Sequence, residues 1–153
     1  MVLSHSLENT GKKVIETNVY NHNFFVIDEQ PIGPAYVIKF PFTPTGEPQG
    51  KGSFGKIQDN QIKFLKELSS NDHLQYLSLL GFSNSAKDYD ISIENHKTGA
   101  AVKITSDQPL FKLAFWSAEK TLCPEPFIHI NIKPGETFKW NIFYQFYICG
   151  ITN

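Results

Sequence analysis

Apolar and polar residues alternate with a period of two along most of this chain. The longest run follows a turn-like sequence at residues 133–136 and places a large apolar residue at every second position: Phe138, Trp140, Ile142, Tyr144, Phe146 and Ile148. The preceding residues repeat this pattern with Ile128, Ile130 and Ile132. Successive side chains of a β-strand point to opposite faces of a sheet, so each run predicts a strand with one apolar face.

The rest of the chain contains shorter segments of the same kind. We predict strands at residues 2–7, 19–27, 36–40, 88–94 and 100–105, with turns at residues 9–11 and 95–99. Residues 43–55 are rich in proline, glycine and small polar residues, which is typical of a surface loop. Residues 62–68 are predicted as a short helix. The apolar run at residues 74–80 fits a helix or a strand, because periodicity does not separate the two over so short a length.

Turn-separated strands with almost no helix predict an all-β fold. We expect eight to ten strands, packed as the two antiparallel sheets of a β-sandwich. A chain of 153 residues is long enough for one domain with a substantial core and too short for two ordinary domains. Residues 1–153 are therefore predicted to form a single domain.

The charged residues narrow the choice of ligand. The formal net charge is −1, and the 14 basic residues are all lysines. Arginine, whose planar guanidinium group binds phosphates and base edges through paired hydrogen bonds, does not occur in the sequence. This composition argues against nucleic-acid and phosphate ligands, and neutral small molecules remain the best candidates.

The number and spacing of the cysteines, together with the N-terminal sequence, indicate the cellular compartment. Cys123 and Cys149 form no Cys-x-x-Cys pair and no Cys/His cluster at the spacing of metal ligands, so we expect reduced thiols and no metal site. Glu8, Lys12 and Glu16 interrupt any apolar signal core, and no apolar stretch has the length of a membrane span. The chain as given is expected to be cytoplasmic and to make no membrane contact, although an upstream segment could carry a signal peptide.

Two short segments carry residues suited to acid–base chemistry. His22 lies in an aromatic and amide-rich stretch, and Glu125 lies between Pro124 and Pro126. The prolines restrict the backbone, so Glu125 is held on a stiff, extended segment. A histidine and a carboxylate that face one cleft can transfer protons on opposite sides of a small neutral molecule. The alternatives are a hydrogen-bonded structural histidine and a solvated carboxylate.

Four short motifs, in order along the chain, resemble those of the aldose 1-epimerase (galactose mutarotase) family. Residues 21–25, Asn-His-Asn-Phe-Phe, are similar to that family's Asn-His-x-Tyr-Phe motif, and residues 106–109, Ser-Asp-Gln-Pro, to its Thr-Asp-Gln-Pro turn. Residues 123–126, Cys-Pro-Glu-Pro, resemble the segment that carries the catalytic glutamate, and residues 133–138 the Lys-Pro-Gly-Glu turn before the last strand. The resemblance extends over about residues 3–147 and covers the C-terminal half of the family's domain.

This resemblance implies a reaction and a site. Glu125 would act as general base on the anomeric hydroxyl of a free hexose and His22 as general acid on the ring oxygen, so that α and β anomers interconvert without a metal or an organic cofactor. A bell-shaped dependence of the rate on pH is expected. Trp116 would stack on the sugar and Asn21 would bind a hydroxyl group. The alternatives are that Trp116 belongs to the core and that Asn21 caps its own turn.

The family's domains are about twice as long as this chain, which leaves three alternatives. The chain could be an incomplete enzyme that lacks strands on its N-terminal side, or a sugar-binding module without turnover. It could also be a half-domain that completes its sheets by pairing with another copy, because a divided sandwich leaves open strand edges. The strand predicted directly after Met1 fits a domain that is incomplete at that end.

Overall fold

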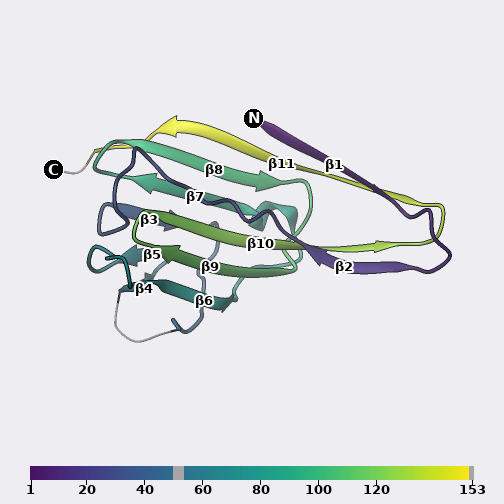
Figure 1. Ribbon diagram of the computed structural model, residues 1–153, viewed down its shortest axis with the longest axis horizontal. Coiled ribbons are helices and arrows are strands. Elements are labelled where there is room, and N and C mark those ends of the chain that lie inside the picture. The colour runs from purple at the N-terminus through teal and green to yellow at the C-terminus, as the bar shows by residue number, and fades with distance from the viewer. Residues whose placement is uncertain (50–53, 152–153) are drawn as a thin grey trace.

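The structure is a computed structural model that describes residues 1–49 and 54–151, and nearly all its regular structure is antiparallel β-strand (Figure 1). One sheet has seven strands in the order β1 (Val2–Glu8), β11 (Thr137–Ile148), β8 (Ala100–Ser106), β7 (Asp90–Asn95), β3 (Tyr36–Lys39), β5 (Gln61–Phe64) and β4 (Gly55–Gln58). The other has four, in the order β2 (Ile15–Val19), β10 (Thr121–Ile132), β9 (Lys112–Ala118) and β6 (Leu74–Leu79). A single turn of 3-10 helix, η1 (Ala86–Asp88), precedes β7. The predicted antiparallel β-sandwich is confirmed.

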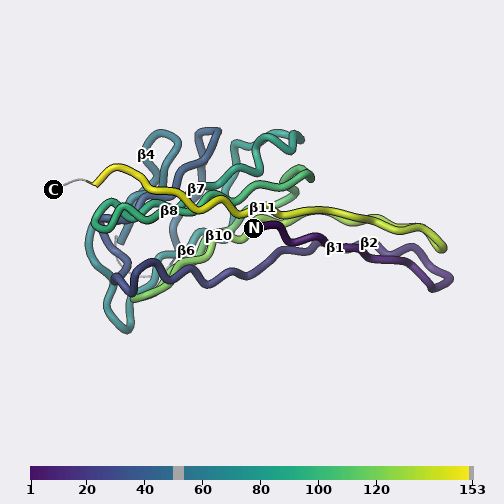
Figure 2. The backbone as a smooth tube through the Cα atoms, turned by 90° about the horizontal axis from the view of Figure 1, so that it is seen from above, coloured from purple at the N-terminus to yellow at the C-terminus, as the bar shows by residue number. Residues whose placement is uncertain are grey.

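The two longest strands give the molecule its shape. β10 and β11 each have 12 residues and extend together beyond the rest of the sandwich, where β1 and β2 flank them (Figures 1 and 2). β1 pairs with β11 and β2 pairs with β10, so the extension has two layers, one from each sheet. Buried Asn9 joins them, because its side-chain amide donates to the carbonyls of Lys13 and Ile132. The predicted turn at residues 9–11 lies here.

The alternating apolar positions build the core between the sheets. Ile128, Ile130 and Ile132 of β10 are fully buried, as their spacing predicts. The apolar row of β11 packs into the core at Trp140, Ile142 and Tyr144, with Phe138 against its margin. The last two residues of that row, Phe146 and Ile148, are 67% and 89% exposed, on the part of β11 that does not pair with β1.

The predicted helix at residues 62–68 is wrong. These residues begin in strand β5, where Ile62 and Phe64 point into the core while Lys63 between them does not. The alternation of core-facing and outward-facing positions therefore outweighed the local sequence pattern that predicted a helix. The ambiguous run at residues 74–80 is also a strand, β6, with Leu74, Tyr76 and Leu79 buried.

The predicted strand at residues 19–27 is displaced. Regular pairing covers Ile15–Val19 instead, and the following residues run on without a ladder until Phe25 forms an isolated bridge with Leu122. The predicted loop at residues 43–55 is irregular over residues 43–49, apart from single bridges at Thr45 and Gln49. Its residues 50–53 lie outside the described part, and Gly55 begins β4.

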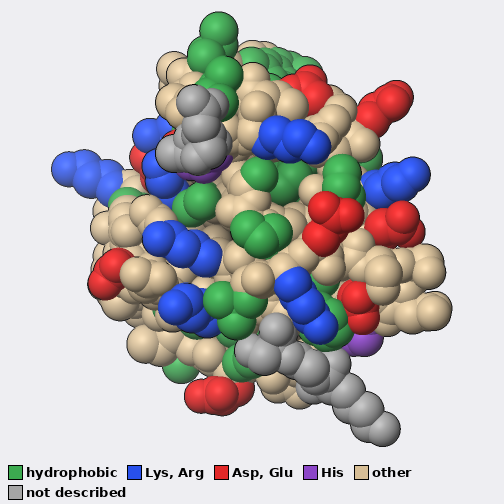
Figure 3. Space-filling model, turned by 90° about the vertical axis from the view of Figure 1, so that its left-hand side faces the viewer, with side chains coloured by type: hydrophobic (Ala, Val, Ile, Leu, Met, Phe, Trp, Pro, Cys, Tyr) green, Lys and Arg blue, Asp and Glu red, His purple; other side chains and the backbone are tan. Residues whose placement is uncertain are grey.

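The surface of the sandwich is mixed in charge. Figure 3 shows lysine and acidic side chains interspersed with small apolar patches over the end of the molecule where the C-terminus lies. Both cysteines are free thiols, as predicted. Within residues 1–49 and 54–151, no helix has the length and apolar character needed to cross a bilayer.

Candidate active site

The chain beyond β2 continues beside β10 in an unbroken register but without a ladder. Val19 pairs with Ile128 at the end of β2. Further on, the Phe25 amide donates to the Leu122 carbonyl at 2.9 Å, and the Leu122 amide returns a hydrogen bond to Phe25 at 3.2 Å. Both pairs fit one antiparallel alignment, and this alignment sets His22 directly opposite Glu125 at its centre.

The two prolines of β10 explain why the ladder opens. Hydrogen-bonded and non-hydrogen-bonded pairs alternate along an antiparallel pair of strands. Counted from the bridge at Phe25, the hydrogen-bonded positions fall on Pro124 and Pro126, which have no N–H to donate. The pairing of β10 with β9 on its other side continues through both prolines. We call residues 20–24 the unzipped segment, because the chain pairs with β10 on either side of it, at Val19 and Phe25, but forms no ladder hydrogen bonds in between.

His22 and Glu125 face each other across this unzipped segment. The Nε2 atom of His22 lies 3.5 Å from Oε1 of Glu125. The pair occupies a non-hydrogen-bonded position, where opposite side chains approach most closely. The His22 side chain is 35% exposed and that of Glu125 is 16% exposed. Solvent and a small molecule can therefore reach a pair whose backbone is held in place.

Aromatic rings surround the pair. Phe24 stacks on His22 with ring centroids 4.3 Å apart, and Trp116 stands edge-on at 6.4 Å from His22 and 6.0 Å from Phe24. On the other side Tyr20 packs against Phe127 at 4.1 Å. Trp116 is only partly buried on β9, where it pairs with Cys123, two residues before Glu125 on the same face of β10. It therefore borders the site and is not a plain core residue.

The sequence-predicted site residues do not all meet. His22, Glu125 and Trp116 are brought together, whereas Asn21 precedes His22 in an extended segment, where successive side chains point in opposite directions, and its sugar-binding role stays a prediction. The neighbouring Asn23 has a structural partner, since its amide donates to the Tyr144 hydroxyl at 2.8 Å.

Sequence reasoning missed three aromatic residues of the site: Tyr20, Phe24 and Phe127. Once the register is known, their alternation with His22 and Glu125 identifies them. The sequence therefore contains the alternation, but these residues can be assigned to the site only when the pairing of residues 20–25 with β10 is known.

Burial and charge fix the states of two neighbours. Burial, together with the Glu125 charge, raises the pKa of the Tyr20 hydroxyl. Burial and Glu125 also raise the pKa of the Cys123 thiol to about 12. Cys123 donates to the Pro124 carbonyl at 3.4 Å. Atoms of His22, Cys123 and Glu125 lie within 4.8 Å of one another, but a thiol that keeps its proton is a poor metal ligand.

The other two motifs have structural roles. Asp107 accepts hydrogen bonds from the backbone amide of Asn141 at 3.0 Å and from its side-chain amide at 2.7 Å, which ties the end of β8 to β11. In the turn before β11, Gly135 adopts a φ of 82° and the Lys133 amide donates to the Glu136 carboxylate at 3.1 Å. Left-handed backbone of this kind favours glycine. Both motifs position β11 in the seven-stranded sheet.

The arrangement suits proton transfer to and from an uncharged ligand. A carboxylate and an imidazole lie within reach of one small group, and exposed rings beside them can cover an apolar face of the ligand. No protein-family model and no curated protein matches the sequence.

Solved structures share the fold. A candidate aldose 1-epimerase from Escherichia coli K12 aligns with a TM-score of 0.64 and 13% identity, over 96% of this chain and 56% of that one. A galactose mutarotase-like protein from Lactobacillus casei aligns with a TM-score of 0.61 and 13% identity, over 95% and 58%. A galactose mutarotase-related enzyme from Lactobacillus acidophilus aligns with a TM-score of 0.56 and 17% identity, over 94% and 57%. The chain thus has the fold of mutarotase-like structures and spans little more than half their length.

Proposed function

We propose that this chain binds a free aldose on the exposed face of the four-stranded sheet and interconverts its α and β anomers through His22 and Glu125. The observation that carries the proposal is the 3.5 Å separation of His22 Nε2 and Glu125 Oε1 at directly opposed positions. The fold shared with the Escherichia coli and Lactobacillus proteins supports the reaction class. The absence of arginine favours an unphosphorylated sugar.

The reaction balances with these two groups alone. Glu125 removes the proton of the anomeric hydroxyl while the His22 imidazolium gives a proton to the ring oxygen, and the bond between C1 and the ring oxygen breaks. The open aldehyde turns about the C1–C2 bond. The ring then closes on the other face of C1, the attacking hydroxyl returns a proton to His22, and Glu125 reprotonates the new anomeric oxygen.

The separation of the two groups suits this chemistry. Both oxygens of a hemiacetal are bonded to the same carbon, so the proton donor and the proton acceptor must lie close together. A pair fixed at opposed strand positions meets that requirement without a large movement. Positioned proton transfer contributes about 10²- to 10⁴-fold per group.

The test is anomer exchange measured by NMR with glucose and galactose. The wild type is expected to accelerate exchange, and His22→Asn and Glu125→Gln are each expected to lose most of the acceleration. Phe143→Ala, at an exposed position of β11, serves as the matched control and should retain it. Folded wild-type protein that gives no acceleration with either sugar would contradict the proposed reaction.

A second function is favoured by the open site and the short chain. Phe24 is 62% exposed and the chain spans 56–58% of the similar mutarotase-like structures, so a sugar could bind and leave without turnover. A binding module predicts sugar-dependent chemical-shift changes at Trp116 that persist in Glu125→Gln, with no exchange in any variant. Enzyme and module therefore differ in one measurement on the same samples.

We further propose that the open edges of β1 and β2 pair with a second copy of the chain. β1 ends the seven-stranded sheet and β2 ends the four-stranded sheet, on the same side of the molecule. The Met1 α-ammonium group donates to the Tyr144 carbonyl of β11, and the Asn9 amide donates to the Glu136 carbonyl just before β11, so the alternation directs the Ser6 amide away from β11, toward the open edge. Ser6→Pro is expected to abolish dimers in light scattering while the monomer stays folded. A monomeric wild type would contradict this proposal.

A further inference from the structure

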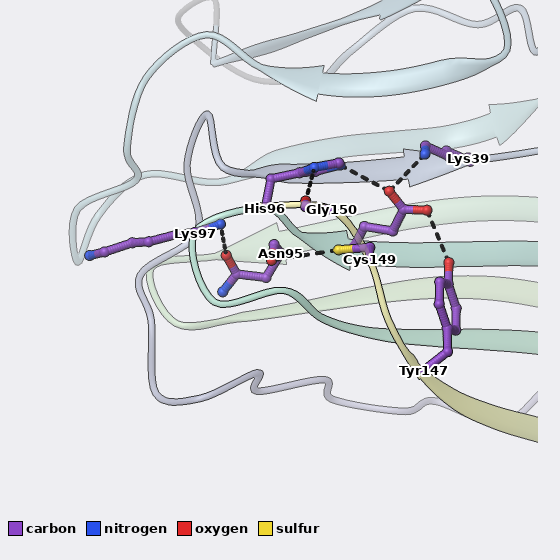
Figure 4. Close-up of polar contacts among 8 residues, drawn as sticks. Lys39, Asn95, His96, Lys97, Tyr147, Cys149 and Gly150 are labelled. Atoms are coloured by element: carbon purple, nitrogen blue, oxygen red, sulfur yellow. Dashed lines mark hydrogen bonds and ion pairs between the residues drawn. The ribbon is translucent and has the colours of Figure 1, made fainter. Parts of the chain in front are cut away.

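A second cluster of metal-binding side chains lies where β7 and β11 end. Glu94 is on β7, His96 follows that strand and Cys149 follows β11 (Figure 4). A carboxylate oxygen, an imidazole nitrogen and a thiol sulfur of these residues lie within 4.8 Å of one another. Strands β8 to β11 separate Glu94 and His96 from Cys149 in the sequence, so no local sequence motif indicates this cluster.

The backbone holds the three residues together. The Cys149 amide donates to the Gly99 carbonyl at 2.7 Å, and the Gly99 amide donates to the Asn95 carbonyl at 2.8 Å. Gly99 has a φ of 80°, and a Cβ atom there would meet the Cys149 carbonyl at 3.2 Å. Glycine therefore permits the close approach by which the end of β11 folds over the turn between β7 and β8.

Partners orient the histidine and the carboxylate toward each other. His96 Nδ1 faces the Gly150 carbonyl at 2.9 Å, so Nδ1 carries a proton and Nε2 points to Glu94 Oε2, 2.9 Å away. The Tyr147 hydroxyl donates to Glu94 Oε1 at 3.0 Å (Figure 4). A histidine whose far nitrogen donates to a carbonyl, beside a carboxylate that is itself hydrogen-bonded, is the arrangement of outer partners found around bound metal ions.

We propose that Glu94, His96 and Cys149 bind a Zn²⁺ ion that fastens the end of β11 to the end of β7. Thiolate, imidazole and carboxylate together select zinc or cobalt over the hard cations magnesium and calcium. A tetrahedral zinc site with bonds of about 2.0–2.3 Å separates its ligand atoms by about 3.3–3.8 Å. His96 Nε2 and Glu94 Oε2, now 2.9 Å apart, must open slightly to admit the ion, and the Cys149 thiol, within 4.8 Å of both, must move toward it; small side-chain rotations supply both changes.

When zinc binds, it displaces protons and the Lys39 ammonium group from the cluster. Bonds form from zinc to Sγ, Nε2 and a Glu94 oxygen, and the protons of the Cys149 thiol and of His96 Nε2 pass to solvent. Lys39, whose Nζ lies 2.7 Å from Glu94 Oε2, gives up that contact. A groove of about 260 Å³ lined by Lys39, Gln61 and Lys63 adjoins His96, so the lysine has room to turn away. Two protons and one ammonium group leave as one Zn²⁺ ion binds, so the formal charge of the cluster falls by one.

The corresponding cluster at the candidate active site serves as an internal control. His22, Cys123 and Glu125 also bring their ligand atoms within 4.8 Å, but Cys123 is fully buried and its thiol donates to the Pro124 carbonyl at 3.4 Å, whereas the contact of the Cys149 thiol with the Asn95 carbonyl is longer, at 3.8 Å. Cys149 is only partly buried. Zinc is therefore assigned to the cluster of Glu94, His96 and Cys149.

The test is a titration of the reduced, metal-free chain with Co²⁺, followed by displacement with Zn²⁺. The wild type should give a cobalt–thiolate charge-transfer band and tetrahedral d–d bands, which Zn²⁺ removes. Cys149→Ser should lose the charge-transfer band and Cys123→Ser should keep it. Tyr147→Phe, which keeps all three ligands, should weaken Co²⁺ binding about tenfold.

A second readout covers variants that fold poorly. Saturating Zn²⁺ should raise the unfolding temperature of the wild type and of Cys123→Ser, and should leave that of His96→Gln unchanged. The proposal is overturned by cobalt binding without a thiolate band, by a band that disappears in Cys123→Ser but not in Cys149→Ser, or by no binding at all. Each result is independent of the sugar chemistry at His22 and Glu125.

Discussion

Two of the histidine–glutamate pairs of this molecule, His96–Glu94 and His22–Glu125, lie in very different surroundings. Glu94 is buried and accepts hydrogen bonds from Lys39, His96 and Tyr147, all at 3.0 Å or less. Glu125 has one long contact, 3.5 Å to His22, and lies under open aromatic rings. The same two residue types can therefore have different roles, and the groups around each pair determine which role it has. Three donors surround Glu94, and Lys39 must leave before a metal ion can bind there, whereas Glu125 keeps acceptor capacity for a small ligand.

Charge-removing substitutions break this comparison most strongly. Glu125→Gln is expected to lower anomer exchange by about 10²- to 10⁴-fold, because the base is lost. Glu94→Gln should leave the exchange rate unchanged in the same NMR measurement. Equal losses in the two variants would mean that exchange follows the integrity of the fold and not the chemistry of Glu125.

Stability should respond in the opposite order. Glu94→Gln removes the charge that Lys39, His96 and the Tyr147 hydroxyl face, and is expected to lower the free energy of unfolding by about 1–3 kcal/mol. The value stays below that of a fully buried pair because the Lys39 side chain is 36% exposed. Urea unfolding at neutral pH with a chelator measures it. Glu125→Gln, as the control, should change stability by less than about 0.5 kcal/mol.

Removing a ring sharpens the contrast between an open and a closed pair. Phe24→Ala deletes an exposed ring that stacks on His22, and is expected to weaken sugar affinity about 3- to 10-fold. Phe146→Ala removes an equally exposed ring from the end of β11 and should leave the affinity unchanged. Ligand titration followed by NMR compares them. Equal weakening would show that the sugar does not lie against Phe24.

A third carboxylate, Asp107, tests what neutral donors contribute. Burial alone would raise the pKa of Asp107, but hydrogen bonds from Asn141 bring it below its ordinary value of 3.8. A lowered pKa stabilises the folded state above the unfolded pKa, and this stability is lost as the pH falls through the folded pKa. Asp107→Asn is therefore expected to cost about 0.5–1 kcal/mol at pH 7, a modest value because the group is exposed.

The pH dependence of that cost is the diagnostic result. The difference in unfolding free energy between wild type and Asp107→Asn should vanish at strongly acid pH, where both side chains are uncharged. Urea unfolding at the two pH values measures it. A difference that is constant with pH would assign the effect to packing and not to the carboxylate charge.

Much of this molecule could be predicted from the sequence, for a definite reason. The period-two alternation was enough to predict β10 and β11, because the position of a residue within its own strand determines which face of the sheet it points to. Ile130 and Ile142 are buried as this rule predicts. The same local rule failed at residues 62–68, where a charged residue between Ile62 and Phe64 fits a helix surface and a sheet surface equally well.

The site was predictable where its residues lie opposite each other in one register, and not elsewhere. His22 and Glu125 were named from their own segments, but the rings of Tyr20 and Phe127 became part of the site only through pairing across the gap. Glu94 and Cys149 meet because β7 and β11 lie on either side of β8 in the sheet, although β8 to β11 separate the two residues in the sequence. No pattern within either segment contains that long-range information.

The unzipped segment between Val19 and Phe25 has a consequence for how this surface can change. Its ends are anchored to β10 at Ile128 and Leu122, and two prolines leave its middle without ladder hydrogen bonds. Substitutions there cost no sheet pairing, so the residues on either side of His22 can diversify while His22 is kept and the sandwich persists. A library of variants confined to these positions should therefore yield altered ligand preferences at a high rate of folded members, which makes the segment the natural starting point for engineering.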